Sequence, residues 1–179
     1  MSESDDPPVE KRVGDALAAA EGTVAVAESC TGGRITSLLA SVPGASAYLT
    51  QGLVAYAYDT HRTLLGVSRE TLDAHGAVST ECAREMARAA RDRADATWGV
   101  AATGICGPGG GTPEKPVGTA YIAVSYAGGW GTETSKTVVE THEFDGDRRE
   151  VNERIARRSI EALNEAIGRA PIDRLSANR

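Results

Sequence analysis

Residues 23–33, TVAVAESCTGG, decide how this chain is expected to fold. The uncharged run at residues 23–27 is typical of a buried strand. It passes directly into Glu28, Ser29 and a glycine pair, after which Ile35, Leu38 and Leu39 recur at helical spacing. A buried strand, a tight glycine turn and a helix in that order indicate an α/β fold.

The alternation of strands and helices continues along the chain. Helical spacing predicts helices over residues 9–21, 60–65, 80–94 and 147–167, and Ser68 and Ser79 are suited to capping two of the middle helices. Strand-like segments occupy residues 48–58, 98–102, 119–126 and 134–144, and the last two predict a hairpin around Gly128 and Gly129. Asp147 and Glu150 have the spacing of a capping box.

These elements predict an α/β fold with a single three-layer domain over residues 9–168, in which a mixed sheet carries helices on both faces. Residues 1–8 are acidic and contain two prolines, so we expect a disordered N-terminus there. Residues 169–179 are expected to form a frayed tail.

Composition excludes several classes of protein. The chain has 179 residues, of which 41% are hydrophobic, and this length suits one domain with a full core. The net charge of -6 argues against nucleic acid as a partner, and no apolar run has the length of a membrane span. The three cysteines lack metal-ligand spacing and suggest free thiols. We therefore expect a cytoplasmic protein without a metal ion and without a membrane or nucleic-acid partner.

Ser29 is the first candidate functional residue. It follows a strand and precedes a helix, which places it at the carboxyl end of the strand, where open α/β folds bind ligands. The backbone N–H groups of Thr31, Gly32 and Gly33 can hold a phosphate or stabilise an oxyanion. The same sequence also suits a structural role, in which Ser29 and Thr31 cap the helix and the glycines permit the turn.

A second glycine-rich loop strengthens the functional interpretation. Residues 103–118 contain six glycines and three prolines and directly follow a predicted strand. Loops of this length without secondary structure are usually functional, and their exposed N–H groups can form an anion nest. The candidate ligand-binding residues in this loop are Thr103, Gly104, Gly107, Gly109, Gly110 and Lys115, the last of which adds a positive charge suited to a phosphate.

Five segments together carry a family resemblance. They are AESCTGG (27–33), GLVAYAYDTHRTLLGV (52–67), HGAVS (75–79), TGICGPGGGTPEKPVGTAYIAV (103–124) and FDGDR (144–148). Together they resemble the C-terminal domain of the competence/damage-inducible CinA family, over about residues 9–167. The resemblance implies a nicotinamide mononucleotide deamidase, which hydrolyses the carboxamide of a pyridine nucleotide to a carboxylate and ammonia. It further implies that no metal or organic cofactor is needed, and it suggests a homodimer or a higher homo-oligomer.

The resemblance also implies roles for individual residues. Ser29 matches the family's proposed nucleophile, Tyr56 a tyrosine held near it, and Thr103 and Gly104 the loop that faces the substrate. Arg148 matches the arginine of the GDR motif and is suited to bind an acidic ligand group.

His61 stands where the family usually has a lysine that acts as the base for the serine. A neutral imidazole can accept the proton of a serine nucleophile, although it is shorter than a lysine side chain. Alternatively, His61 is a surface residue, and the domain binds a nucleotide without turning it over.

Two cysteines lie in the glycine loops. Cys30 stands at a helix N-terminus, where a thiol can become reactive, but a small buried thiol is the simpler interpretation. Cys106 occupies a loop position where the family commonly has a small residue, and we interpret it as a space-filling side chain.

Overall fold

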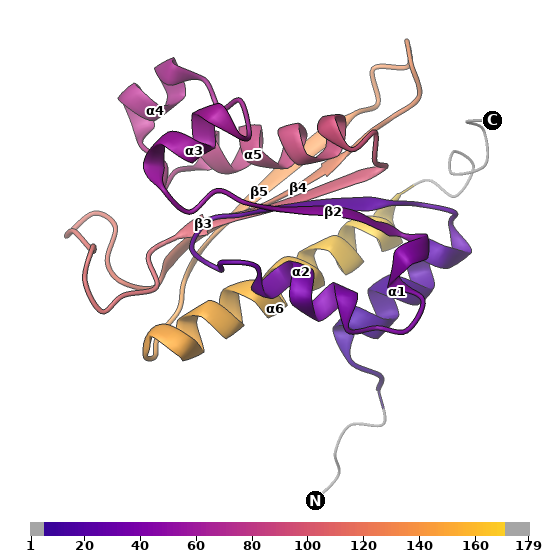
Figure 1. Ribbon diagram of the computed structural model, residues 1–179, viewed down its shortest axis with the longest axis horizontal. Helices are drawn as coiled ribbons and strands as arrows, with labels where there is room; N and C mark the ends of the chain where they lie inside the picture. The colour runs from indigo at the N-terminus through magenta and orange to yellow at the C-terminus, as the bar shows by residue number, and fades with distance from the viewer. Residues whose placement is uncertain (1–5, 171–179) are drawn as a thin grey trace, which may run out of the picture.

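A computed structural model describes residues 6–170 of the chain as a sheet between two layers of helices (Figure 1). In chain order the elements are α1 (Val9–Ala19), β1 (Val24–Glu28), α2 (Arg34–Ala40), the 3-10 turn η1 (Ala45–Ala47), β2 (Leu49–Val54), α3 (Tyr58–Thr63), α4 (Arg69–His75), α5 (Thr80–Arg93), β3 (Trp98–Gly104), β4 (Thr119–Tyr126), β5 (Lys136–Glu143) and α6 (Arg148–Arg169).

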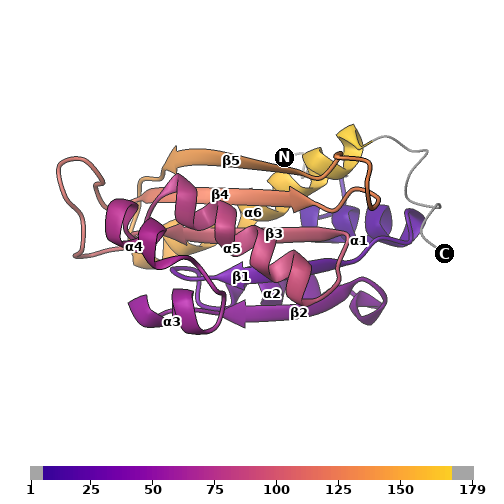
Figure 2. The same cartoon turned by 90° about the horizontal axis from the view of Figure 1, so that it is seen from above.

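The five strands form one mixed sheet in the order β2-β1-β3-β4-β5 (Figure 2). β1 pairs in parallel with both β2 and β3, whereas β3, β4 and β5 pair antiparallel. The mixed sheet and the predicted hairpin are therefore both confirmed.

Helices cover both faces of the sheet, which confirms the predicted three layers. α1, α2 and α6 lie on one face, and α3, α4 and α5 lie on the other (Figure 1). In β1, Val24 and Val26 belong to the first hydrophobic cluster, and Ala25 and Ala27 belong to the second. Because successive side chains of a strand point to opposite faces, a strand between two helical layers is apolar at every position.

The connections after β1 and β2 leave the sheet in opposite directions. From β1 the chain turns to α2 on one face, and from β2 it continues into α3 on the other (Figure 1). In the order β2-β1-β3-β4-β5 the chain goes from β1 to β2 on one side and returns to β3 on the other, so the carboxyl ends of the parallel neighbours β1 and β3 form a topological switch point, the usual position of ligand sites in open α/β sheets.

Most helix boundaries follow the expected local signals. The side chains of Ser68 and Ser79 accept hydrogen bonds at the starts of α4 and α5, and Asp147 and Glu150 form the expected capping box. The strand expected over residues 48–58 is shorter, since β2 ends at Val54 and α3 begins at Tyr58. β2 lies at the sheet edge, and the chain leaves it there to enter the second helical layer.

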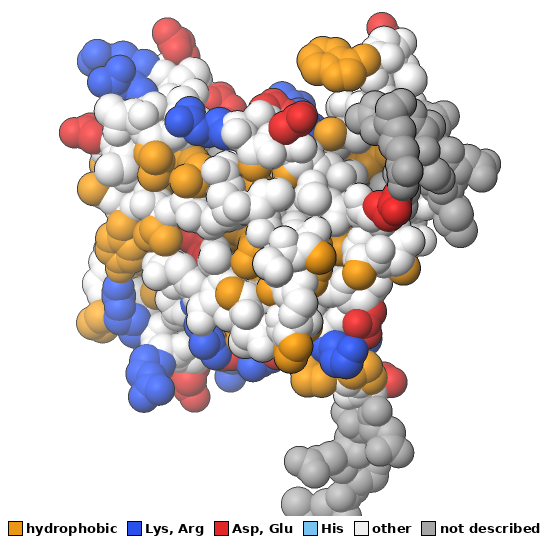
Figure 3. Space-filling model, turned by 45° about the vertical axis from the view of Figure 1, so that its right-hand side comes forward, with side chains coloured by type: hydrophobic (Ala, Val, Ile, Leu, Met, Phe, Trp, Pro, Cys, Tyr) orange, Lys and Arg blue, Asp and Glu red, His pale blue; other side chains and the backbone are white. Residues whose placement is uncertain are grey.

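The terminal predictions fall mostly outside the described residues, which exclude 1–5 and 171–179. Of the expected tail, Arg169 is still the last residue of α6. On the face drawn in Figure 3, hydrophobic side chains appear in small separate groups rather than as one continuous patch. Within residues 6–170, no helix combines the length and the apolar character needed to cross a bilayer.

Candidate functional site

Residues 29–33, here called the Ser29 turn, join β1 to α2 in a fixed backbone conformation. Ser29 N–H donates to the carbonyl oxygen of Ala102 at 3.0 Å, so the turn stays attached to β3. Gly33 has a φ of 101°, in the left-handed region that favours glycine, and is the N-cap of α2. Ser29 itself is 9% exposed, and among the described residues its hydroxyl group has no hydrogen-bond partner. A ligand at the switch point can therefore reach an uncommitted hydroxyl group.

The side chain of Glu28, the last residue of β1, caps the start of α2. Its side chain is fully buried, and its two carboxylate oxygens accept the backbone N–H groups of Gly33, Ile35 and Thr36 at 2.8–3.0 Å. The Thr36 hydroxyl donates a fourth hydrogen bond at 2.7 Å. The protein thus supplies its own anion to this helix N-terminus.

This arrangement differs from the expectation that three consecutive N–H groups are available to a ligand. Gly33 N–H is committed to Glu28, and Gly32 N–H donates to the carbonyl oxygen of Ser29 at 3.1 Å. Within residues 6–170, Thr31 N–H has no such partner, and the buried Thr31 hydroxyl oxygen is unpartnered as well. Of the three predicted residues, Thr31 therefore retains groups that can bind a ligand.

The long loop between β3 and β4 is closed at its base. Ile105 N–H donates to the carbonyl oxygen of Thr119 at 2.9 Å, and Gly118 N–H donates to that of Ile105 at 2.8 Å. Thr103 is buried and donates its hydroxyl hydrogen to the carbonyl oxygen of Ala77 at 2.7 Å. The base of this loop is therefore rigid.

The glycines of the loop differ in their surroundings. Gly104 ends β3 and is half-buried, Gly107 is buried, and Gly109 and Gly110 are exposed. At Gly107 the φ is 85°, and a Cβ atom would lie 2.6 Å from a methyl carbon of Val117. Gly107 is therefore required by backbone conformation and by close packing.

Lys115 lies against the α4–α5 turn. Its ammonium group donates to the carbonyl oxygens of His75 and Val78 at 3.2 and 2.6 Å. This geometry differs from the phosphate contact expected for Lys115, because the ammonium group already donates to two carbonyl oxygens. In the structure, Lys115 ties the long loop to the HGAVS segment.

Two residues of α6 join the separate parts of the site. The Arg148 guanidinium donates to the carbonyl oxygen of Gly107 and to the hydroxyl oxygen of Tyr56, the latter at 2.5 Å. One turn later, the Asn152 side chain donates to the carbonyl oxygens of Cys30 and Thr31, each at 3.1 Å. The start of α6 thereby holds both glycine loops and Tyr56 together.

Asn152 was not among the sequence-based candidates. It stands four residues after Arg148, and residues at this spacing share one face of a helix. That spacing from the GDR motif is the signal that could have identified it.

An open groove adjoins this junction at the start of α6. It has a volume of about 860 Å³ and is lined by Arg34, Asp147, Arg148, Arg149, Glu150, Asn152, Glu153 and Arg154. The Arg34 Nε atom forms an ion pair with Glu153 at 2.6 Å, which raises the pKa of the guanidinium and lowers that of the carboxylate. The lining combines four arginines with three carboxylates, so the groove has a net positive charge of one, which favours an anionic ligand group.

His61 is buried in α3, with 1% of its surface exposed, so the interpretation of His61 as a surface residue is wrong. Its Nδ1 atom lies 3.2 Å from the carbonyl oxygens of Ala57 and Tyr58. Carbonyl groups only accept hydrogen bonds, so Nδ1 carries the proton and Nε2 of the neutral ring carries the lone pair. This Nε2 atom is buried without a partner, and no hydrogen bond between described residues joins His61 to Ser29.

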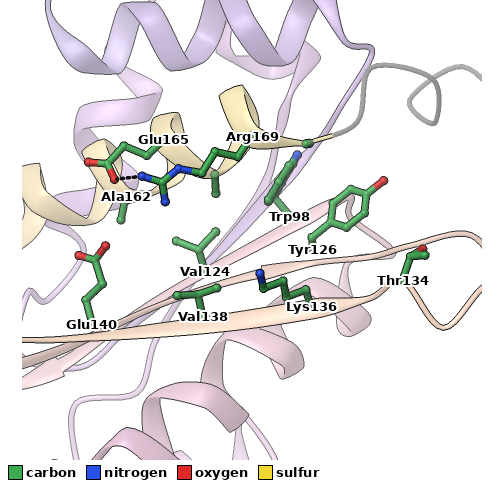
Figure 4. Close-up of a pocket in the computed structure, with 12 residues that line it drawn as sticks. Trp98, Val124, Tyr126, Thr134, Lys136, Val138, Glu140, Ala162, Glu165 and Arg169 are labelled. Atoms are coloured by element: carbon green, nitrogen blue, oxygen red, sulfur yellow. Dashed lines mark hydrogen bonds and ion pairs between the residues drawn. The ribbon is translucent and has the colours of Figure 1, made fainter.

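A second cavity lies toward the end of the sheet that is opposite to the Ser29 turn. It has a volume of about 450 Å³ and is bounded by α6 and the strands β3, β4 and β5 (Figure 4). Val124 and Val138 lie on one side and the Glu165–Arg169 ion pair on the other. None of the predicted site residues lines it.

Over the described ranges, no group of three or more histidine, cysteine or acidic side chains could hold a metal ion.

Comparison with known proteins gives a consistent result. Residues 6–167 match the CinA C-terminal domain. The chain is 52% identical over 148 residues to a CinA-like protein of Anaeromyxobacter dehalogenans, which covers 83% of this chain and 34% of that protein. It is 46% identical over 143 residues to a putative competence-damage inducible protein of Clostridioides difficile, covering 80% of this chain and 32% of the relative. The chain therefore spans about a third of the length of these curated relatives.

Solved structures share the fold. A CinA superfamily protein of Klebsiella pneumoniae superposes with a TM-score of 0.83 at 30% identity, covering 90% of this chain and 97% of that one. A competence/damage inducible protein of Agrobacterium tumefaciens has a TM-score of 0.81 at 35% identity, covering 94% of this chain and all of that one.

Proposed function

Since the chain belongs to the CinA C-terminal domain family, we propose that it hydrolyses the carboxamide of nicotinamide mononucleotide, with Ser29 as the nucleophile. The observation that carries the proposal is the junction formed by Arg148 and Asn152, which unites Tyr56 with both glycine loops beside Ser29. The motifs that resemble the deamidases are thus combined into one site.

Recognition of the nucleotide depends on its charge. The groove beside Arg148 carries four guanidinium groups against three carboxylates, and guanidinium N–H groups form bidentate contacts with phosphate oxygens. Tyr56 is 57% exposed and offers an aromatic face beside Gly32, which suits a pyridine ring.

The reaction is an acyl transfer through a serine ester. The Ser29 hydroxyl oxygen attacks the carboxamide carbon while its proton passes to His61 Nε2. The imidazolium returns the proton to the leaving nitrogen, ammonia departs, and water then hydrolyses the ester with the same base. The products are nicotinate mononucleotide and ammonia. Thr31 N–H is suited to stabilise the oxyanion, because it is uncommitted beside the nucleophile.

One observation favours a second function. No hydrogen bond between described residues connects His61 with Ser29, so the base must approach the serine when substrate binds. A domain in which it does not approach binds the nucleotide without hydrolysing it. This second function is a nucleotide-binding module of the same fold.

The test is ammonia release from nicotinamide mononucleotide, combined with calorimetric binding of the same compound. Ser29→Ala is expected to abolish turnover and to retain binding, because the loops and arginines hold the nucleotide. His61→Ala is expected to lower the rate by about a hundredfold or more. His61→Lys restores the residue usual in the family and is expected to retain or raise activity.

The variants separate the two functions. An active wild type whose rate is unaffected by His61→Ala would place the base elsewhere. An inactive wild type that binds the nucleotide, and gains turnover in His61→Lys, would establish the binding module. A wild type that neither binds nor hydrolyses the nucleotide would exclude both functions.

A further inference from the structure

Cys30 and Cys106 come from different glycine loops and meet where the loops touch. The Cys106 thiol donates to the carbonyl oxygen of Cys30 at a sulfur–oxygen distance of 3.5 Å. Cys106 is 5% exposed and belongs to the first hydrophobic cluster, against which the partly buried Cys30 packs. The third cysteine, Cys82, is buried in the second cluster, under the opposite face of the sheet.

The backbone on both sides of this contact is held in place. Asn152 donates to the carbonyl oxygen of Cys30, and the preceding Ser29 N–H donates to β3. On the other loop, Arg148 donates to the carbonyl oxygen of Gly107, directly after Cys106. The contact between Cys106 and Cys30 is therefore fixed in the folded protein.

The two thiols differ in acidity. The neighbouring Cys30 side chain lowers the pKa of Cys106, burial opposes this shift, and the charge of Arg148 adds to it. The Cys106 side chain, together with burial, raises the pKa of Cys30. Cys106 is thus the sulfur that ionises first. A lowered thiol pKa beside a second thiol is one feature of redox-sensitive cysteines.

We propose that Cys30 and Cys106 form a redox-sensitive dithiol, which a hydroperoxide converts to an intramolecular disulfide between the two glycine loops. In the first step, the Cys106 thiolate attacks the peroxide oxygen and becomes a sulfenic acid, and the O–O bond breaks to release hydroxide or an alkoxide. In the second step, the Cys30 sulfur attacks the sulfenic sulfur, and the displaced hydroxyl group leaves with the Cys30 proton as water. The peroxide is reduced by two electrons, and the two thiols supply them.

The disulfide would tie the residue next to Ser29 to the long loop. Once formed, it adds a covalent link to the hydrogen bonds that already hold the two loops together. The proposal concerns covalent chemistry of the thiols and does not depend on the proposed hydrolysis.

Hydrogen peroxide is the probe for the test. The reduced protein is treated with it, denatured, alkylated and analysed by peptide mass spectrometry without reduction. We expect alkylatable thiols to fall from three to one, with a peptide pair that links Cys30 to Cys106 and a chain that remains monomeric on a non-reducing gel. Cys82 should stay alkylatable, because burial raises its pKa to about 12. Three remaining thiols, or a link that involves Cys82 or a second chain, would overturn the proposal.

Matched variants test each sulfur. Cys82→Ser should form the same linked peptide, and Cys106→Ala should form none. In Cys30→Ser, a sulfenic-acid reagent should label Cys106, because the resolving thiol is missing. Absence of this label, with Cys106 still reduced, would overturn the assignment of Cys106 as the attacking sulfur.

Discussion

Thr31 and Thr103 are both buried threonines of the site, but they differ in how their hydroxyl groups are satisfied. Thr103 donates to the carbonyl oxygen of Ala77, whereas the Thr31 hydroxyl oxygen has no partner among the described residues. Removal of a satisfied buried hydrogen bond costs about 1–2 kcal/mol, whereas removal of an unsatisfied hydroxyl group costs little. The Thr103 hydroxyl group therefore stabilises the fold, whereas the Thr31 hydroxyl group is available to a ligand.

We predict that Thr103→Val lowers the free energy of unfolding by about 1–2 kcal/mol and that Thr31→Val leaves it nearly unchanged or raises it. Urea unfolding of both variants measures the difference. An equal loss in Thr31→Val would mean that its hydroxyl group has a structural partner in solution.

At the scale of single elements, α2 and α6 both begin with a carboxylate cap, and the caps differ in burial. Glu28 is fully buried and accepts four hydrogen bonds, whereas Asp147 is exposed. Glu28→Gln replaces one carboxylate oxygen with an NH2 group that faces N–H or O–H donors. Asp147→Asn keeps an acceptor of a type that is preferred at helix N-caps.

We predict that Glu28→Gln destabilises the protein by about 2 kcal/mol or more. Asp147→Asn is its control and should have a much smaller effect. The measurement is urea unfolding at neutral pH. Equal effects of the two substitutions would show that the buried carboxylate is not what holds the start of α2.

α6 is also joined to β5 by an ionic contact. Burial alone would raise the pKa of Glu140, but hydrogen bonds from Arg158 at 2.7 and 2.9 Å, and one with His142, hold it below its usual range. A carboxylate whose pKa is lower in the folded protein adds stability above its unfolded pKa. That stability is lost as the pH falls through the folded pKa.

We predict that Glu140→Gln lowers the unfolding free energy at pH 7 by about 1 kcal/mol, and that the difference from wild type disappears in acid. Glu161 is the control, because it meets Arg158 at 3.4 Å with a more exposed side chain. Glu161→Gln should change stability less. Unfolding by urea from pH 7 down to pH 3 tests both variants, and a difference that stays constant with pH would contradict the prediction.

For the whole molecule, the family resemblance predicts a homodimer or a higher homo-oligomer. Val54, Tyr56 and Tyr58 are each more than two-fifths exposed where the edge strand β2 ends, so an apolar group is available to a second copy. We expect light scattering at micromolar concentration to give at least twice the chain mass of 18.6 kDa. A monomer under these conditions would contradict this expectation.

The sequence by itself determined the features that depend on neighbouring residues. Periodicity identified the buried strand before Ser29 and the helices on either side of it. The capping roles of Ser68, Ser79 and Asp147 could be predicted because a helix cap is a contact between residues two or three positions apart. The five family segments indicated the CinA domain and, through it, the candidate residues.

Only the tertiary structure decided how those residues are used. It turned Lys115 toward the carbonyl groups of residues 75 and 78. It buried His61 with a free Nε2 atom, and it placed Cys30 against Cys106. Asn152 reaches the Ser29 turn across more than 120 positions of the sequence. Such contacts arise from how helices pack on the sheet, and local periodicity carries no information about which distant side chain fills a given hydrogen bond.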